Sequence, residues 1–166
     1  MASKVPRGSA SRHEACFNCS VSGWELQNAV CAAWCFSLMT DCVVHIVDDD
    51  EVVLHSAACL VEAAGYTVRC YTSGRHLLDL ADLSGVILLD IDMPDLDGLA
   101  VQRALASRLP ALPVIFLTGH GDDIMEARAL EAGAIGFIAK PVHQEVLLNA
   151  IAAGFEAARQ ARRSHA

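Results

Sequence analysis

From residue 42 to about residue 158, short apolar and β-branched segments alternate with longer segments whose apolar residues recur every three to four positions. The short segments are typical of buried strands and the longer ones of amphipathic helices. The predicted strands are residues 42–47, 67–71, 85–90, 113–118 and 136–140. Because these strands are almost continuously apolar, we expect a parallel sheet that is covered on both faces.

Five βα units favour an open, doubly wound α/β sheet, since a closed eight-stranded barrel needs about 250 residues. We expect the flavodoxin-like strand order 2-1-3-4-5, in which strands 1 and 3 are neighbours. Ligands of such sheets bind beyond the carboxyl ends of the strands, at this switch point. Leu147, Ile151 and Phe155 are expected on the buried face of the last helix, and Gly65 and Gly133 at the ends of earlier helices.

The formal net charge of -8 argues against a nucleic-acid surface, which is usually basic. Only residues 159–166 form a short basic tail, and Arg159, Arg162 and Arg163 are interpreted as complementing the negative end of a helix. We therefore expect no direct binding of nucleic acid.

The seven cysteines fall into two groups. The first group spells C-x2-C and C-x3-C, a spacing only loosely compatible with zinc, and comprises Cys16, Cys19, Cys31 and Cys35. The second group lies in apolar periodic segments and comprises Cys42, Cys59 and Cys70. We interpret the first group as incidental and the second as core residues, because a free thiol behaves as a small hydrophobic group.

Residues 1–38 lack the βα pattern and are interpreted as an N-terminal extension, which leaves residues 39–158 as the folded domain. The extension is vector sequence, an upstream segment or a regulatory tail; its "VPRGS" is similar to the remnant of a cleavable tag. The apolar residues 29–39 are too few to cross a bilayer, which takes about 20. We expect a cytoplasmic protein without a membrane span.

Acidic residues gather where strands 1 and 3 end. Asp48, Asp49 and Asp50 follow strand 1, and Asp90 ends strand 3. Converging carboxylates raise one another's pKa unless a cation neutralises them. Mg2+ prefers oxygen ligands and keeps several waters, so this cluster predicts a magnesium site.

Two further polar residues end the neighbouring strands. Thr118 ends strand 4 and Lys140 ends strand 5, so a hydroxyl and an ammonium group are expected at the same rim. Lys140 is also the only lysine after Lys4. Such a combination at the ends of four strands is hard to obtain by chance.

The segments "HIVDDDE", "LLDIDMPDLDG", "FLTGHGD" and "FIAKP" resemble the receiver domain of two-component response regulators, and most of all the nitrogen-fixation type. The resemblance implies that Asp90 is the phosphoacceptor and that Asp48 and Asp49 hold Mg2+ with Asp90 and the backbone carbonyl of Asp92. It also implies that Lys140 and Thr118 contact the phosphoryl group. Asp95 and Asp97 are interpreted as turn and helix-cap residues.

The same resemblance implies a function as a phosphoacceptor for a sensor histidine kinase, without enzymatic turnover beyond self-phosphorylation and dephosphorylation. Phe137 is expected to be a switch residue together with Thr118. Residues 121–158, the helix after strand 4, strand 5 and the last helix, are expected to contact a downstream protein or a second copy. Longer relatives carry a helix-turn-helix output domain, so the chain is expected to be a stand-alone or excised receiver.

Several alternatives stay open. The resemblance assigns Asp48 and Asp49 to the metal, but the presence of Asp50 allows the register to slip by one. The D-x-D of "LLDID" also fits a haloacid-dehalogenase-type phosphatase, and the fold could serve as a binding module that needs no phosphorylation. The chain has no P-loop, and the spacing of its histidines does not indicate zinc.

Overall fold

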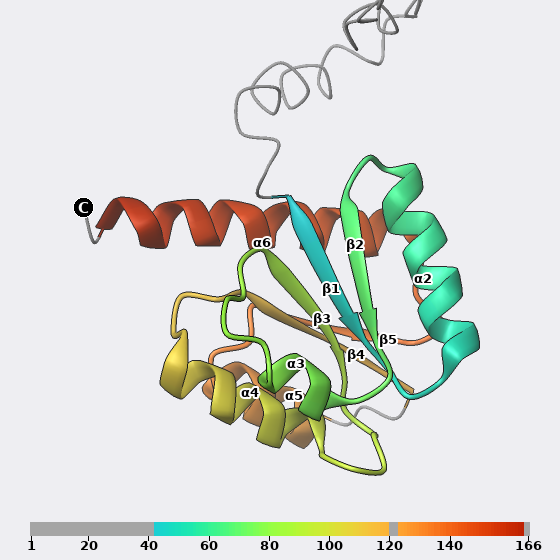
Figure 1. Cartoon of the computed structure of the whole chain (residues 1–166), viewed down its shortest axis with the longest axis horizontal. Coiled ribbons are helices and arrows are strands. Elements are labelled where there is room, and N and C mark those ends of the chain that lie inside the picture. The colour runs from blue at the N-terminus through green and yellow to red at the C-terminus, as the bar shows by residue number, and fades with distance from the viewer. Residues whose placement is uncertain (1–41, 120–122, 165–166) are drawn as a thin grey trace, which may run out of the picture. The chain divides into compact units, whose positions relative to one another are not determined.

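The computed structural model describes residues 42–119 and 123–164. Strands and helices alternate along this part of the chain (Figure 1). The strands are β1 (Val43–Val47), β2 (Thr67–Tyr71), β3 (Val86–Asp90), β4 (Val114–Thr118) and β5 (Gly136–Ala139). The helices are α2 (Glu51–Ala63), α3 (Gly74–Leu78), α4 (Gly98–Arg108), α5 (Asp123–Glu131) and α6 (Gln144–Ser164).

The five strands form one parallel sheet in the order β2-β1-β3-β4-β5, which confirms the predicted order. Val47, at the end of β1, pairs with Tyr71 of β2 on one side and with Leu89 of β3 on the other. The ends of β1 and β3 are therefore adjacent. The observed strands differ from the predicted ones by no more than one residue at either end.

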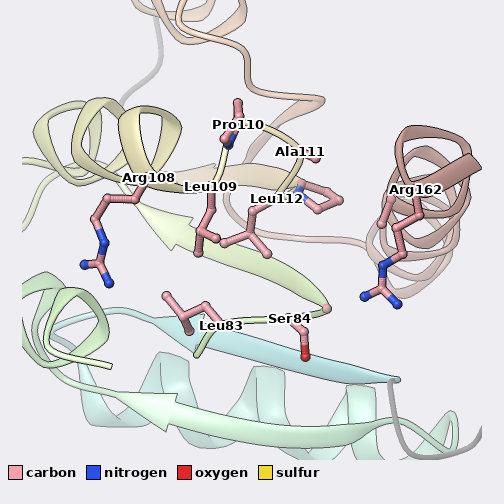
Figure 2. A pocket seen from close by; sticks show the side chains of 11 residues that line it. Leu83, Ser84, Arg108, Leu109, Pro110, Ala111, Leu112 and Arg162 are labelled. Atoms are coloured by element: carbon pink, nitrogen blue, oxygen red, sulfur yellow. The ribbon is translucent and has the colours of Figure 1, made fainter. Parts of the chain in front are cut away.

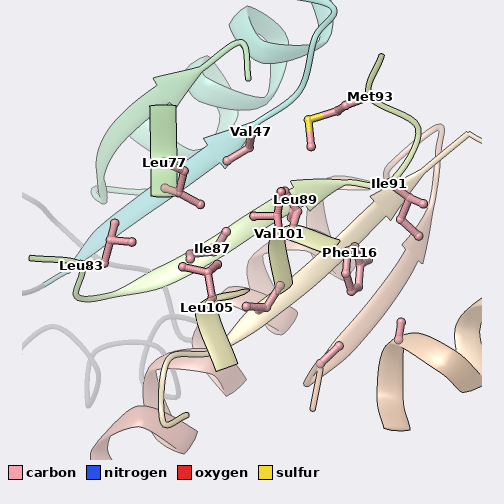
Figure 3. Packing of buried hydrophobic residues seen from close by; sticks show 13 residues of the cluster. Val47, Leu77, Leu83, Ile87, Leu89, Ile91, Met93, Val101, Leu105 and Phe116 are labelled. Carbon is pink, nitrogen blue, oxygen red and sulfur yellow. The ribbon is translucent and has the colours of Figure 1, made fainter. Parts of the chain in front are cut away.

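Helices cover both faces of the sheet (Figure 1). On one face α3, α4 and α5 pack over a cluster that includes Leu77, Leu89 and Phe116 (Figure 3). On the other face α2 and α6 pack over a second cluster, to which α6 contributes the three predicted residues Leu147, Ile151 and Phe155. The central strands β3 and β4 are fully buried because both of their faces are covered, whereas most residues of the edge strand β2 are exposed.

Aspartate side chains begin two of the helices. Asp50 precedes α2 and accepts a hydrogen bond from the backbone N–H of Val52 at 2.8 Å. Asp97 precedes α4 and accepts from the N–H of Leu99 at 2.9 Å, which confirms its predicted role as a helix cap. Each carboxylate satisfies an N–H that has no partner within the helix.

The cysteine prediction was partly wrong. Cys42 is half-buried, but Cys59 and Cys70 are exposed. Cys59 lies on the outer side of α2, because Leu54 and Val61 are the residues that this helix buries. Cys70 lies on β2, the edge strand, which has a neighbouring strand on one side only. The four earlier cysteines lie outside the described residues.

The C-terminal helix is longer than the sequence suggested. α6 continues to Ser164, so residues 159–164 belong to it rather than to a separate tail, with Arg162 and Arg163 in its last turn. In the described part of the chain, no helix is both long enough and apolar enough to cross a membrane.

Candidate functional site

Three aspartates meet at the carboxyl ends of β1 and β3. Asp48 and Asp49 follow β1 directly, and Asp90 is the last residue of β3. Each offers one carboxylate oxygen, and these three oxygens lie within 4.8 Å of one another. Parallel pairing of β1 with β3 produces this cluster, because it places the ends of both strands at the same edge of the sheet.

Lys140 contacts two of the three aspartates. Its Nζ donates to Asp48 Oδ2 at 2.6 Å and to Asp90 Oδ1 at 2.8 Å. The side chains of Asp48 and Asp90 are only 3% and 6% exposed, while that of Lys140 is 21% exposed. The ammonium group comes from the end of β5, where the backbone N–H of Lys140 also donates to the carbonyl oxygen of Thr118.

The site raises the pKa values of both Asp90 and Lys140. Burial raises the pKa of Asp90, and the negative charges of Asp48 and Asp92 add to this, whereas the hydrogen bond and charge of Lys140 offset part of it. Burial alone would lower the pKa of Lys140. The hydrogen bonds and charges of Asp48 and Asp90 outweigh that effect and raise it, so Lys140 stays a cation in the site.

The remaining acidic residues occupy different positions. Asp49 is exposed although its carboxylate belongs to the cluster. The side chain of Asp50 caps α2, and its backbone N–H donates to Asp48 Oδ1 at 3.0 Å. Asp92 is exposed on the loop after β3. The structure therefore brings Asp48 and Asp49, rather than Asp50, together with Asp90.

Thr118 and Phe137 lie on the face of the sheet that α3, α4 and α5 cover. Thr118 is fully buried at the end of β4. Phe137 is half-buried on β5, and its ring lies 6.5 Å from that of Phe116 between centroids, in a tilted arrangement. Phe116 and Phe137 both contribute to the cluster under these three helices.

An apolar cleft adjoins the acidic site on the other face. It has a volume of about 530 Å³, lies between α2 and α6, and has Lys140 at its border. Its lining includes Val52, Leu60 and Val142. Sequence reasoning missed this cleft, because the periodicity of α2 and α6 shows which side of each helix is apolar but not how closely the two helices approach.

A second, smaller cavity of about 270 Å³ lies at the opposite edge of the sheet, beside the start of β3 (Figure 2). Arg108 and Arg162 lie on opposite sides of it (Figure 2). Arg108 donates to the carbonyl oxygens of Leu78 and Leu80 at 2.7 and 3.1 Å, so it secures the end of α3. This cavity is separate from the acidic site.

The sequence matches a protein-family model and curated proteins over most of the described residues. The model of the response regulator receiver domain matches residues 44–152. The chain is 43% identical over 120 residues to the response regulator protein TmoT of Ectopseudomonas mendocina, covering 71% of the chain and 54% of that protein. It is 40% identical over 115 residues to the transcriptional regulatory protein FixJ of Rhizobium meliloti, covering 68% of the chain and 56% of FixJ.

Solved structures of response regulators also superpose on the chain. The crystal structure of FixJ-N superposes with a TM-score of 0.64 at 38% identity, over 72% of the chain and 94% of that structure. The response regulator StyR superposes with a TM-score of 0.70 at 32% identity, over 75% of the chain and 64% of StyR. The chain spans about half the length of the curated relatives that it matches.

Proposed function

Because the chain belongs to the receiver domain family of response regulators, we propose that it accepts a phosphoryl group on Asp90 within a two-component phosphorelay. The observation that carries this proposal is the position of Asp90 at the end of β3, with two further carboxylates in one cluster and the ammonium group of Lys140 at 2.8 Å. The family acts in signalling rather than in the turnover of a substrate.

Receiver domains bind Mg2+ at an aspartate cluster, and the donor set of this chain fits that ion. Three carboxylate oxygens within 4.8 Å form a hard, anionic partial shell of the kind that Mg2+ prefers. Asp48, Asp49 and Asp90 would hold the ion, with the backbone carbonyl of Asp92 as a further ligand. When bound, the ion neutralises the negative charge that gathers during phosphoryl transfer.

Asp90 supplies the nucleophile. One oxygen of its carboxylate forms a bond to phosphorus while the bond between phosphorus and the donor group breaks. Lys140 already contacts Oδ1 of Asp90, so its charge is in position to stabilise the phosphoryl oxygens. The hydroxyl of Thr118, at the end of the neighbouring strand β4, donates a hydrogen bond to one of these oxygens.

The proposed switch joins Thr118 to Phe137. Phe137 packs beside Phe116, and Thr118 is two positions after Phe116 on β4 and therefore on the same face. A movement of the threonine toward the phosphoryl group would then free space for the aromatic ring. The proposed output face is residues 121–158, of which 121 and 122 lie outside the described residues. Large apolar side chains exposed on this face support the proposal, namely Ile124, Leu130, Ile135 and Val146.

A sensor histidine kinase is the proposed phosphodonor. The cleft between α2 and α6 supports this, because it is apolar and borders Lys140 next to the phosphoacceptor. Val52, at the start of α2, lines the cleft and is 73% exposed. Apolar surface beside the reacting carboxylate suits a partner that must bring its phosphohistidine close to Asp90.

The phosphatase alternative has less support from the geometry. It requires the D-x-D motif on the first strand, whereas Asp90 ends β3, and its second aspartate, Asp92, is exposed on the following loop. The contact of Lys140 with Asp90 favours the phosphoacceptor over a binding module that works without phosphorylation.

The test is phosphorylation with a small phosphodonor and Mg2+, followed by intact mass. We expect one acid-stable, base-labile phosphoryl group on the wild-type chain and none on Asp90→Asn or after chelation of Mg2+. Asp95→Asn is the matched control, since Asp95 is exposed on the same loop and is expected to leave labelling unchanged. Equal labelling of Asp90→Asn contradicts the assignment, and sustained release of phosphate from esters favours the phosphatase.

A further inference from the structure

A buried amide lies between α4 and α5. Gln102 of α4 is only 1% exposed, and its neighbours along the helix include Val101 and Leu105, which belong to the apolar cluster (Figure 3). Its Nε2 donates to the carbonyl oxygen of Ala129 on α5 at 3.3 Å. Only the NH2 group of the amide can donate to a carbonyl, so this contact fixes which way the amide is turned. Sequence reasoning missed Gln102, because a glutamine is usually exposed.

The hydrogen bond reaches α5 at its C-terminal end. The carbonyl oxygen of Ala129 also accepts from the backbone N–H of Ala134 at 3.0 Å, and the N–H of Gly133 donates to the carbonyl oxygen of Leu130 at 2.9 Å. Gly133 has a φ of +94°, and this combination is a common way of ending an α-helix. The carbonyl oxygen of Ala129 therefore uses one lone pair for the end of α5 and the other for Gln102.

This end is also where α5 is most closely packed. Within the described helix α5, Ala129 is the one buried residue and Met125 is half-buried, while the other residues are exposed, Ile124 and Leu130 among them. A helix that buries so little apolar surface opens or shifts more readily than the core of the domain. The contact with Gln102 is thus made at the one buried position of a weakly held helix.

The amide of Gln102 is only partly satisfied. Its Oε1 is buried and has no hydrogen-bond partner in the described part of the chain. Burying an acceptor without a partner costs free energy, and an apolar side chain of similar shape avoids that cost. The cost offsets the gain from the bond to Ala129, so Gln102 contributes little to global stability. Its effect is local and concerns the position of α5.

We propose that Gln102 is a positioning residue, which ties the C-terminal end of α5 to α4 and limits the movement of α5 when Asp90 is phosphorylated. The tie is close to the proposed switch along the chain, because Ala134 is three residues before Phe137. Loss of the tie makes a displaced α5 less costly and raises the population of the arrangement that phosphorylation selects. This role in switching rests on the proposed function, whereas the tie itself does not.

The test compares Gln102→Met and Gln102→Leu with the wild type. Both side chains fill a similar volume and lack the donor as well as the unpaired acceptor. We expect amide exchange at residues 129–134 of the unphosphorylated chain to become about three- to tenfold faster, the factor expected for the loss of one neutral hydrogen bond. The free energy of unfolding, measured with urea, is expected to stay equal or to rise. Gln160→Met is the matched control, since Gln160 is exposed on α6.

The same exchange measurement with phosphodonor tests the role in switching. We expect both variants to be labelled on Asp90 as the wild type is. Without phosphodonor, the exchange of their α5 should already approach that of the phosphorylated wild type, so that phosphorylation adds less.

Wild-type exchange at residues 129–134 in both variants overturns the tie. Faster exchange throughout the domain together with a lower free energy of unfolding also overturns it, because it indicates a structural role alone. Faster local exchange with a wild-type response to phosphodonor overturns the role in switching. If the wild type itself is not labelled, the proposed function fails, while the exchange of the unphosphorylated variants still decides whether the tie exists.

Discussion

At the scale of single residues, three consecutive aspartates have three different environments. Asp48 is buried and contacts Lys140, Asp49 is exposed with its carboxylate in the cluster, and Asp50 caps α2. These differences follow from the end of a strand meeting the start of a helix within three residues. They separate the residues that would hold a cation from the one that stabilises the helix.

This separation leads to a prediction about Asp49 and Asp50. We expect Asp49→Asn to weaken Mg2+ binding about tenfold, because it removes one charged ligand from the cluster. Asp50→Ala is expected to leave Mg2+ affinity unchanged and to lower the free energy of unfolding by about 1 kcal/mol through loss of the cap. Calorimetric Mg2+ titration and urea unfolding measure the two effects.

Asp50→Asn is the matched control, since asparagine caps helices as well as aspartate does. It is expected to retain both the affinity and the stability of the wild type. If Asp50→Asn weakened Mg2+ binding and Asp49→Asn did not, the metal ligands would be shifted by one residue.

At the scale of elements, His45 connects three segments. It lies buried on β1, its Nδ1 is 3.1 Å from the hydroxyl oxygen of Tyr71 on β2, and its Nε2 is 3.1 Å from the carbonyl oxygen of Ser84 before β3. In the neutral ring Nε2 donates to Ser84 and Nδ1 accepts from Tyr71. Burial lowers the pKa of His45, and the charge of Arg69 adds to this despite the opposing effect of Ser84.

The lowered pKa predicts a loss of stability in acid. The unfolded chain takes up a proton on His45 near the ordinary value of 6.5, while the folded chain does so only at lower pH. The neutral imidazole of His45 therefore contributes its full stabilisation of the folded state above pH 6.5. This stabilisation decreases as the pH falls from 6.5 toward the pKa of His45 in the folded chain. The slope can reach about 1.4 kcal/mol per pH unit for one proton.

We expect the free energy of unfolding of His45→Gln to depend less on pH than that of the wild type between about pH 7.5 and pH 5. Urea unfolding at several pH values measures this dependence. His76→Gln, which replaces an exposed histidine, is the matched control and should follow the wild type. Parallel curves for wild type and His45→Gln would contradict the prediction.

At the scale of the whole molecule, Lys140 of the acidic site and Phe137 of the proposed switch adjoin different helical layers. Lys140 borders the cleft between α2 and α6, whereas Phe137 packs under α3, α4 and α5. They are three residues apart on and just after β5. The backbone N–H of Lys140 also donates to the carbonyl oxygen of Thr118, so the end of β5 is bonded to the strand that carries the other proposed switch residue.

We predict that phosphorylation promotes self-association or partner binding through residues 121–158, because added charge at one rim can shift a two-state element by a few kcal/mol. Sedimentation with and without phosphodonor measures the assembly state, with Asp90→Asn as the control. Phe137→Ala is expected to accept phosphate but to lose the response. Identical mass distributions and unchanged amide exchange across the described part of this face would contradict the prediction.

A further prediction concerns the boundary of the domain. Residues 1–38 are expected to be dispensable, because β1 to β5 already complete the sheet and both of its faces are covered. A chain that begins at Met39 should show the same cooperative unfolding transition and the same phosphate labelling as residues 1–166. Loss of either would assign a structural role to the N-terminal extension.

The local pattern of the sequence determined the fold. In every βα unit, a continuously apolar segment predicts a strand and a segment of helical periodicity predicts the helix that follows it. The short connections between these segments leave few possible topologies. Asp90, Thr118 and Lys140 could be placed at one rim because each ends a strand, and parallel strands end at the same edge. These inferences need only the chain direction and the order of the strands.

Only the tertiary structure decided how groups on different elements meet. It showed that Lys140 contacts Asp48 as well as Asp90, that Asp50 caps α2, and that Cys59 is exposed beside His55. Periodicity identifies the apolar side of an element, but burial depends on how completely neighbouring elements cover that side. Distances between side chains depend on the same packing, which no single segment of the sequence contains.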